Sequence, residues 1–396
     1  MEIPSKIDGP VSFYAYHLKI GSIDKLILLF GDIHALPKYT CRPCGKDCST
    51  LIDFLKDTFK NTKVCTDFFF EKKYLKRRTS VVYKKIPNTL IKDVEDEFID
   101  CLNPSKKKCH QFGNVRMHYA DIRQNSILLI KHVFKEVHVF KEVSENIKLT
   151  SVHITEFHKH LNENIDKFKT RAQNLFKYII GISDLSPVIR DLDVKKHVRF
   201  QRNRIQKQWN VLTPEIKTKI KPIIITLYER FIDKVFKGWY DWFHLVRFID
   251  LLGHQPIIMD VYLLLRMLRK DLNDSNIVII YAGNNHIVEY TKFLDDFPAR
   301  NITRQHMKTR FEKCVVIPKT ARKKIYSLSL GLPKNKCLYK EAGVIEMIAI
   351  LADHFKTRKT YIIFCLMETS QKHNLTENEV LIIIYNLVKG LNLVVE

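Results

Sequence analysis

The sequence predicts an α/β protein: a mostly parallel sheet with flanking helices, a long helical insertion and a small helical C-terminal unit. Two continuously apolar segments, residues 26–30 and 277–282, are typical of strands that are buried on both faces. The segments 64–70 and 115–123 add two further strand patterns, and helical patterns separate the strands, which indicates βαβ units. A long run of helical periodicity in the middle of the chain interrupts this alternation and predicts the insertion.

Helical segments fill the spaces between the expected strands. In the longest of them, apolar residues recur every three or four positions from Ile154 to Ile179, as on one face of an amphipathic helix. Thr213 and Pro214 are typical of an N-cap and a first helical turn, so another helix is expected to begin there. The expected helices cover about residues 49–60, 154–179, 213–253 (as one helix or a pair) and 256–272.

The length of 396 residues is enough for one large domain or two ordinary ones. We expect an α/β domain over residues 1–305, with the helical insertion at about 145–255. Residues 306–396 are expected to form a basic connector and a small, mostly helical C-terminal unit.

The composition is that of a globular protein, with 45% hydrophobic and 11% aromatic residues. No apolar segment approaches the roughly 18 residues of a membrane-spanning helix, and the N-terminus lacks the basic-then-apolar form of a signal peptide. Nine cysteines, an odd number spread along the chain, favour reduced thiols over a disulfide framework. We therefore expect an intracellular protein with no transmembrane segment.

The formal net charge is +23, and short lysine runs such as residues 106–108 contribute to it. Such a surface attracts polyanions, so electrostatic binding of nucleic acid is one expectation. The other is that the charge serves solubility in a lysine-rich protein. No signature of an RNA-binding sheet or of a zinc-finger array accompanies the charge.

A glycine and then a histidine follow both of the continuously apolar segments. The first is followed by Gly31-Asp32-Ile33-His34 and the second by Gly283-Asn284-Asn285-His286. Ligands of open α/β sheets bind just beyond the carboxyl ends of the strands. We therefore expect His34 and His286 to point to one place at this edge of the sheet.

The Asp32-x-His34 pattern has an alternative interpretation as the start of a two-metal site, as in calcineurin-like metallophosphoesterases. That site requires a Gly-Asp-x-x-Asp-Arg segment, then an Asn-His-Asp/Glu segment, and then a Gly-His-x-His segment. Asn285-His286 imitates the second of these but lies about 250 residues further along the chain, and the others are missing. The pattern therefore disfavours this class of enzyme.

The order of these features resembles the superfamily of TIKI/TraB, ChaN-like and erythromycin-esterase-like proteins. Its members have a first strand ending in Gly-x-x-His, a strand ending in Glu and a last strand ending in Gly-x-x-His. The matching segments here are 31–34, 67–71 and 283–286, and Asp260-Val261-Tyr262 with Arg266-Met267 looks like the family's segment before the last strand. The resemblance covers about residues 20–295, and Asp32 stands where several members have glutamate.

The resemblance implies hydrolytic chemistry at the strand ends. Glu71 is expected to act as a general base on a water molecule. His34 and His286 are expected either to bind a divalent metal ion or to serve as acid–base partners of Glu71.

Three further residues complete the candidate catalytic set. Asp32 or Asp121 is expected to hold the second ring nitrogen of a histidine, as carboxylates do in metal sites. Arg123 is expected either to bind an anionic group of the substrate or to pair with Asp121.

A cysteine-rich segment, Cys41-Arg42-Pro43-Cys44-Gly45-Lys46-Asp47-Cys48, follows the first of these strands. Cys-x-Pro-Cys-Gly resembles a zinc-knuckle turn, in which glycine lets backbone amides face the thiolates. Cys41, Cys44 and Cys48 would then be ligands of a structural zinc ion, with Cys65 or the Cys109-His110 pair as candidates for the fourth position. Alternatively, these cysteines are merely small residues of a loop.

Two functions of different classes follow from these patterns. The first is a hydrolase-like enzyme, with or without a metal ion, acting on an unidentified substrate at the strand ends. The second is a catalytically silent, basic structural or virion protein that binds other proteins, of virion or host, or nucleic acid. The richness in lysine, isoleucine and asparagine also resembles uncharacterised proteins of large DNA viruses of protists. A protein of that kind would lie in the host cytoplasm or in the virion.

Overall fold

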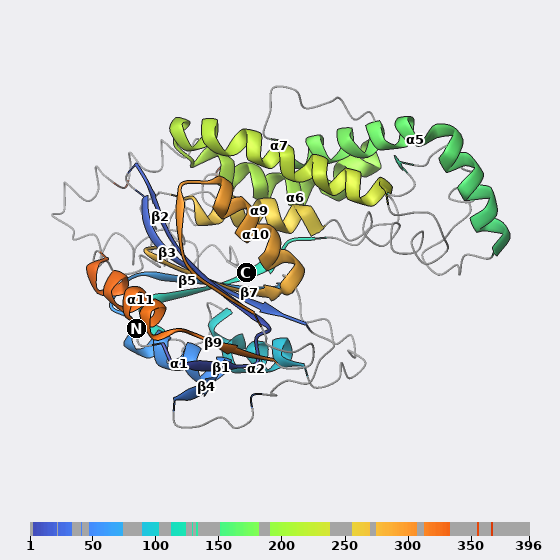
Figure 1. The fold of residues 1–396 in the computed structure, drawn as a ribbon. Coiled ribbons are helices and arrows are strands. Elements are labelled where there is room, and N and C mark those ends of the chain that lie inside the picture. Colours follow the sequence, from blue (N-terminus) through green and yellow to red (C-terminus); the bar gives the residue numbers. More distant parts are fainter. Residues whose placement is uncertain are drawn as a thin grey trace.

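A six-stranded mixed sheet forms the centre of the protein in the computed structural model (Figure 1). Its strands follow the order β6-β5-β7-β3-β2-β8, and the first four run parallel to one another. β2 and β8 add an antiparallel edge. The strands are β2 (Ser12–Ile20), β3 (Ile23–Asp32), β5 (Thr66–Lys73), β6 (Val115–Asp121), β7 (Ile277–Gly283) and β8 (Ala299–His306). The expected α/β fold with a mostly parallel sheet is therefore confirmed.

The structure describes most of the α/β part of the chain. The described residues are 3–21, 23–33, 41, 47–73, 89–102, 112–123, 129, 132–133, 151–181, 191–237, 256–269, 275–306, 313–332, 355 and 366. The segment with His34 and Cys44, the Cys109-His110 pair and most of the stretch 306–396 lie outside them.

β3 and β7 lie at the centre of the sheet, and this position explains their uninterrupted apolar sequences. Leu26 and Leu28 of β3 pack on one face of the sheet, whereas Ile27 and Leu29 pack on the other. All four side chains are completely buried. A strand covered on both faces needs apolar residues at every position rather than at every second one.

Helices cover both faces of the sheet (Figure 1). One face is covered by three helices, which share a core with the even-numbered residues of β3. The opposite face carries two helices, and the helical insertion packs over these as a further layer. The first group comprises α1 (Leu51–Asn61), α2 (Leu90–Leu102) and α11 (Lys319–Gly331), and the second comprises α9 (Pro256–Met267) and α10 (Asn284–Asp296). The insertion contributes α5 (Ser151–Ile180), α6 (Leu192–Asn210) and α7 (Pro214–Lys237).

A second, three-stranded sheet was not expected. It has the order β4-β1-β9 and consists of β1 (Lys6–Asp8), β4 (Cys48–Thr50) and β9 (Cys314–Val316). β9 and α11 fall within residues 306–396, for which the sequence predicted a basic connector and a small, mostly helical C-terminal unit. The structure pairs β9 with β1 and buries Ile325 of α11 in the same core as α1. Among the described helices, none is both long and apolar enough to cross a membrane.

Gly31 lies where β3 passes the first turn of α10. A Cβ atom at this position would collide with the Ser12 hydroxyl group, would lie 2.5 Å from Asn284 Oδ1 and would be 3.2 Å from Asn284 Cα. The Ser12 hydroxyl also donates a hydrogen bond of 2.5 Å to Asn284 Oδ1, so neither side chain can move away without losing it. The glycine therefore permits the strand and the helix to approach each other.

We expect Gly31→Ala to lower the free energy of unfolding by about 1–3 kcal/mol, the usual cost of overpacking. Urea unfolding followed by circular dichroism measures this change. Gly113→Ala is the matched control, because no atom lies within 4 Å of the Cβ it would add. Equal unfolding midpoints for the two variants would contradict the role of Gly31.

Candidate functional site

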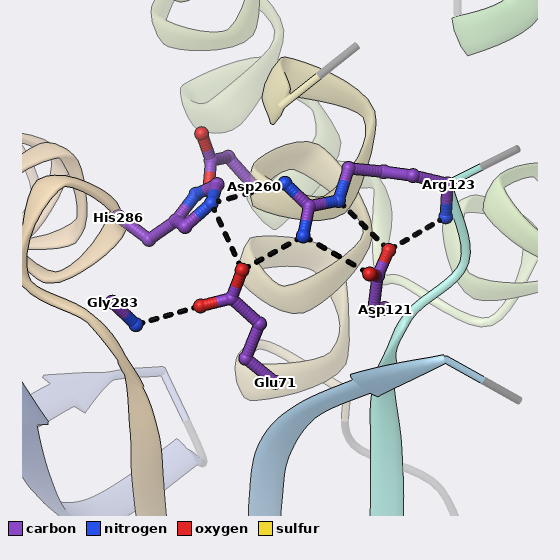
Figure 2. Close-up of polar contacts among 6 residues, drawn as sticks. All are labelled: Glu71, Asp121, Arg123, Asp260, Gly283 and His286. Carbon is purple, nitrogen blue, oxygen red and sulfur yellow. Dashed lines mark hydrogen bonds and ion pairs between the residues drawn. The ribbon is translucent and has the colours of Figure 1, made fainter. Parts of the chain in front are cut away.

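Polar side chains gather at the carboxyl ends of the parallel strands (Figure 2). Glu71 belongs to β5, Asp121 ends β6, and Gly283 ends β7. The helix α10 begins directly after Gly283, where the sequence suggested a polar turn, and its first turn carries His286. The order β6-β5-β7 places these three strand ends side by side.

Glu71 is the centre of this group. Its Oε2 atom accepts a hydrogen bond of 2.6 Å from the backbone N–H of Gly283, the N-cap residue of α10. Its Oε1 atom lies 2.7 Å from Arg123 Nη2 and 3.5 Å from His286 Nε2. Glu71 therefore binds the positive end of a helix dipole and faces two cationic side chains.

Asp121 holds Arg123 in place. The Arg123 guanidinium donates two hydrogen bonds to its carboxylate, of 2.8 Å from Nε and 3.0 Å from Nη2. The backbone N–H of Arg123 adds a third hydrogen bond of 2.9 Å. Burial alone would lower the pKa of Arg123, but the carboxylates of Asp121 and Glu71 outweigh it and raise the pKa.

His286 lies between two carboxylates. Its Nδ1 atom is 2.7 Å from Asp260 Oδ1 in α9, and its Nε2 atom faces Glu71. Burial opposes the charge on the imidazole, but Asp260 and Glu71 raise the pKa of His286 to about 10. His286 is therefore an imidazolium at neutral pH, with both ring nitrogens directed at carboxylates.

The surroundings of His286 bear on the expected metal ion in two opposite ways. Asp260 at Nδ1 is the kind of carboxylate partner that metal-bound histidines usually have. At the other ring nitrogen, Arg123 Nη1 lies 3.3 Å from Nε2, where its charge would repel a divalent cation. Over the part of the chain that the structure describes, no group of three or more His, Cys, Asp or Glu side chains could hold a metal ion.

Asp32 lies elsewhere, on the opposite face of the sheet. Its Oδ1 atom forms an ion pair of 2.5 Å with Lys313 Nζ, and both side chains are fully buried. Its Oδ2 atom accepts a hydrogen bond of 2.9 Å from the Tyr281 hydroxyl. In the described structure Asp260, and not Asp32, orients His286, and Asp121 binds Arg123.

Asp260 was not among the candidate catalytic residues. It is 5% exposed in a helix whose residues from Ile257 to Leu265 are all buried. A single carboxylate in an apolar helix needs a charged or hydrogen-bonding partner, and that signal is visible in the sequence. The partner itself, His286, is visible only in the fold.

A second polar cluster lies at the opposite ends of the same strands. The Arg116 guanidinium donates hydrogen bonds of 2.7 Å and 2.9 Å to Asp67, whose other neighbour is His118 at 2.7 Å. Burial and the nearby Arg266 lower the pKa of His118 to about 4, so its imidazole is neutral. These residues, with Lys25, Arg269 and Ser275, line a pocket. The sequence analysis did not identify this cluster.

The cysteine segment differs from the expected reduced state. Cys41 forms a disulfide with Cys314 in β9, and Cys48 Sγ lies 3.8 Å from Cys41 Sγ. Cys44 and the candidate fourth ligands Cys109 and His110 lie outside the described residues. The structure thus brings Cys314, 273 positions further along the chain, to this segment.

Comparison with known proteins gives a distant similarity to a viral protein. The chain is 27% identical over 158 residues to an uncharacterised protein of Acanthamoeba polyphaga mimivirus. The match covers 36% of this chain and spans about a third, 34%, of that relative. No protein-family model and no solved structure matches the chain. The chain is therefore similar to a protein of a large DNA virus, and the similarity assigns no activity.

Proposed function

We propose that Glu71, Arg123 and His286 form the active centre of a hydrolase-like enzyme related to the TIKI/TraB, ChaN-like and erythromycin-esterase-like superfamily. The observation that carries the proposal is their convergence from separate elements, at the edge of a parallel sheet where ligands bind. Their side chains are only 11–14% exposed, so their charges act in an environment of low polarity.

In this proposal, the reaction is the addition of water across an ester or amide bond. Glu71 takes a proton from the attacking water, and the His286 imidazolium gives a proton to the leaving group. Arg123 stabilises the negative charge that develops on the carbonyl oxygen. Asp260 and Asp121 hold His286 and Arg123 in position. No step passes through a metal ion at His286, because the Arg123 guanidinium beside Nε2 would repel one.

The test is hydrolysis of a panel of esters and peptides by the full chain. We expect Glu71→Gln to lower the rate for any accepted substrate by about 10²–10⁴-fold, the usual contribution of a general base. Glu289→Gln makes the same chemical change in the exposed Glu289–Lys292 pair of α10 and should leave the rate unchanged. Equal rates for Glu71→Gln and the unmodified protein would sink the proposal.

A second candidate, a silent structural protein, is favoured by a different observation. Each carboxylate of the site has a cationic neighbour. The network is therefore also what a set of ion pairs that only stabilises the fold would look like. A basic virion component with net charge +23 would bind nucleic acid with a steep salt dependence. Nucleic-acid binding curves measured at several salt concentrations, together with the hydrolysis panel, distinguish the two functions. Hydrolysis of any substrate supports the first function. A nucleic-acid affinity that falls steeply with salt, without hydrolysis, supports the second.

A further inference from the structure

The pocket at the amino ends of the parallel strands is rich in positive charge. It lies on the face of the sheet that α9 covers, and β3, β5 and β6 each contribute side chains from near their amino ends. Four of the seven described residues that line it are cationic, and one is a carboxylate. The seven are Lys25, Asp67, Arg116, His118, Arg266, Arg269 and Ser275. Because the imidazole of His118 is neutral, positive charge exceeds negative charge among these side chains.

The fold holds two of the pocket's arginines in fixed positions. The Asp67 carboxylate accepts two hydrogen bonds from the Arg116 guanidinium, and His118 Nε2 lies 2.7 Å from its Oδ1 atom. Arg266 Nη2 lies 3.2 Å from His118 Nδ1, and an arginine can only donate to that nitrogen. The Arg266 guanidinium also lies 5.4 Å from the centre of the Phe69 ring. Side chains that are already held in place lose little conformational entropy when a ligand binds.

The other two cations add charge in a place that water reaches poorly. Lys25 is 1% exposed, and its Nζ atom donates a hydrogen bond of 2.8 Å to the backbone carbonyl of Arg269. Arg269 Nη1 donates one of 2.9 Å to Gln208 Oε1 in α6. Burial and the charges of Arg266 and Arg116 lower the pKa of Arg269 to about 10. Cations that crowd together away from water repel one another, and an anion bound among them would offset this repulsion.

We propose that this pocket binds a phosphate group. Guanidinium groups bind phosphate oxygens through pairs of parallel hydrogen bonds, and three arginines line the pocket. A phosphate dianion offsets two of the positive charges, whereas a carboxylate or a chloride ion offsets one. Arg266 and Arg269 are only half-buried, so a phosphate group can reach them from solvent. The pocket lies at the opposite ends of the strands from Glu71, so this site is separate from the proposed hydrolytic centre.

Equilibrium dialysis of the full chain against radiolabelled inorganic phosphate, at fixed ionic strength, tests the proposal. We expect one saturable site per chain. Arg266→Gln and Arg269→Gln should each raise the Kd about 10-fold or more, since each loses a charge-assisted hydrogen bond. Arg304→Gln removes the same charge from β8, at the opposite edge of the sheet from β6, and should leave the Kd unchanged. Equal values of Kd in the three variants, or no saturable site, would overturn the proposal and assign any binding to the general positive charge.

Competition identifies where the phosphate group comes from. Displacement of inorganic phosphate by glycerol phosphate at similar concentrations indicates a phosphomonoester, and failure to displace it indicates the free ion. Both results support a phosphate site.

A measurement on the unmodified protein decides the matter if a variant fails to fold. Phenylglyoxal modifies accessible arginines, and peptide mapping shows which ones have reacted. Inorganic phosphate should slow the modification of Arg266 and Arg269 but not that of Arg304. Unchanged rates at Arg266 and Arg269 would reject the pocket as the phosphate site.

Discussion

Replacing Lys313 by methionine is expected to lower the free energy of unfolding by about 3–5 kcal/mol. Lys313 Nζ lies 2.5 Å from Asp32 Oδ1, and both side chains have an exposed fraction of 0%. The substitution would leave the Asp32 carboxylate buried without this cation, and a buried carboxylate that loses its cation is costly. Chemical unfolding at neutral pH measures the change.

Two further variants separate the ion pair from simple packing. Asp32→Asn combined with Lys313→Met removes both charges, so it should cost much less than Lys313→Met alone. Lys292→Met breaks the exposed pair with Glu289, and it should cost less than about 1 kcal/mol. If Lys313→Met were no more destabilising than Lys292→Met, Asp32 would have to be compensated in another way.

The central strands could be predicted from the sequence, and the edges of the sheets could not. β3 and β7 can be recognised in the sequence. Both of their faces are covered, and this requires a continuous apolar sequence. β8 has the sequence Ala-Arg-Asn-Ile-Thr-Arg-Gln-His, and as an edge strand it is largely solvated. The three-residue strands β1, β4 and β9 are too short for any periodicity to show.

The sequence placed Glu71 and His286 at one edge of the sheet but could not tell on which face each strand-end residue lies. Phe70 and Phe30 pack on the face covered by α1, so Asp32, two residues after Phe30, lies on that face as well. Glu71 follows Phe70 by one residue and lies on the opposite face. In strands that are apolar throughout, no alternation reveals these faces, and the candidate role of Asp32 depended on that missing information.

Asp260 illustrates a different limit. Its own burial could be inferred from the apolar helix around it. Its contact with His286, however, joins α9 to α10, two helices that lie on the same face of the sheet and are separated in the sequence by β7. Contacts of this kind depend on how helices cross the sheet, which local patterns do not encode. The contact between Cys314 and Cys41 could not be predicted for the same reason. It depends on the pairing of β1 with β9, two strands of three residues each.

The stability of the fold is expected to fall as the pH rises from about 6.5 to about 10, because of His286. Its pKa is raised from 6.5 to about 10 in the folded state. Below pH 6.5 both states bind the proton, and the ion pairs with Asp260 and Glu71 contribute in full. Between the two pKa values the unfolded chain has released the proton that the folded protein keeps. Each pH unit then costs up to roughly 1.4 kcal/mol, and above the folded pKa the contribution is lost.

The difference between variants isolates this contribution from every other group that titrates in the same range. Urea midpoints measured between pH 6 and 9.5 should fall less steeply in His286→Gln than in the unmodified protein. His17→Gln, at a partly exposed histidine that pairs with Asp24, is the matched control and should keep the steeper fall. Titration of ¹³C-labelled histidines by NMR gives a direct reading. A His286 resonance that titrates near pH 6.5 would show that Asp260 and Glu71 do not hold an imidazolium, and the proton donor of the proposed hydrolysis would then be removed with it.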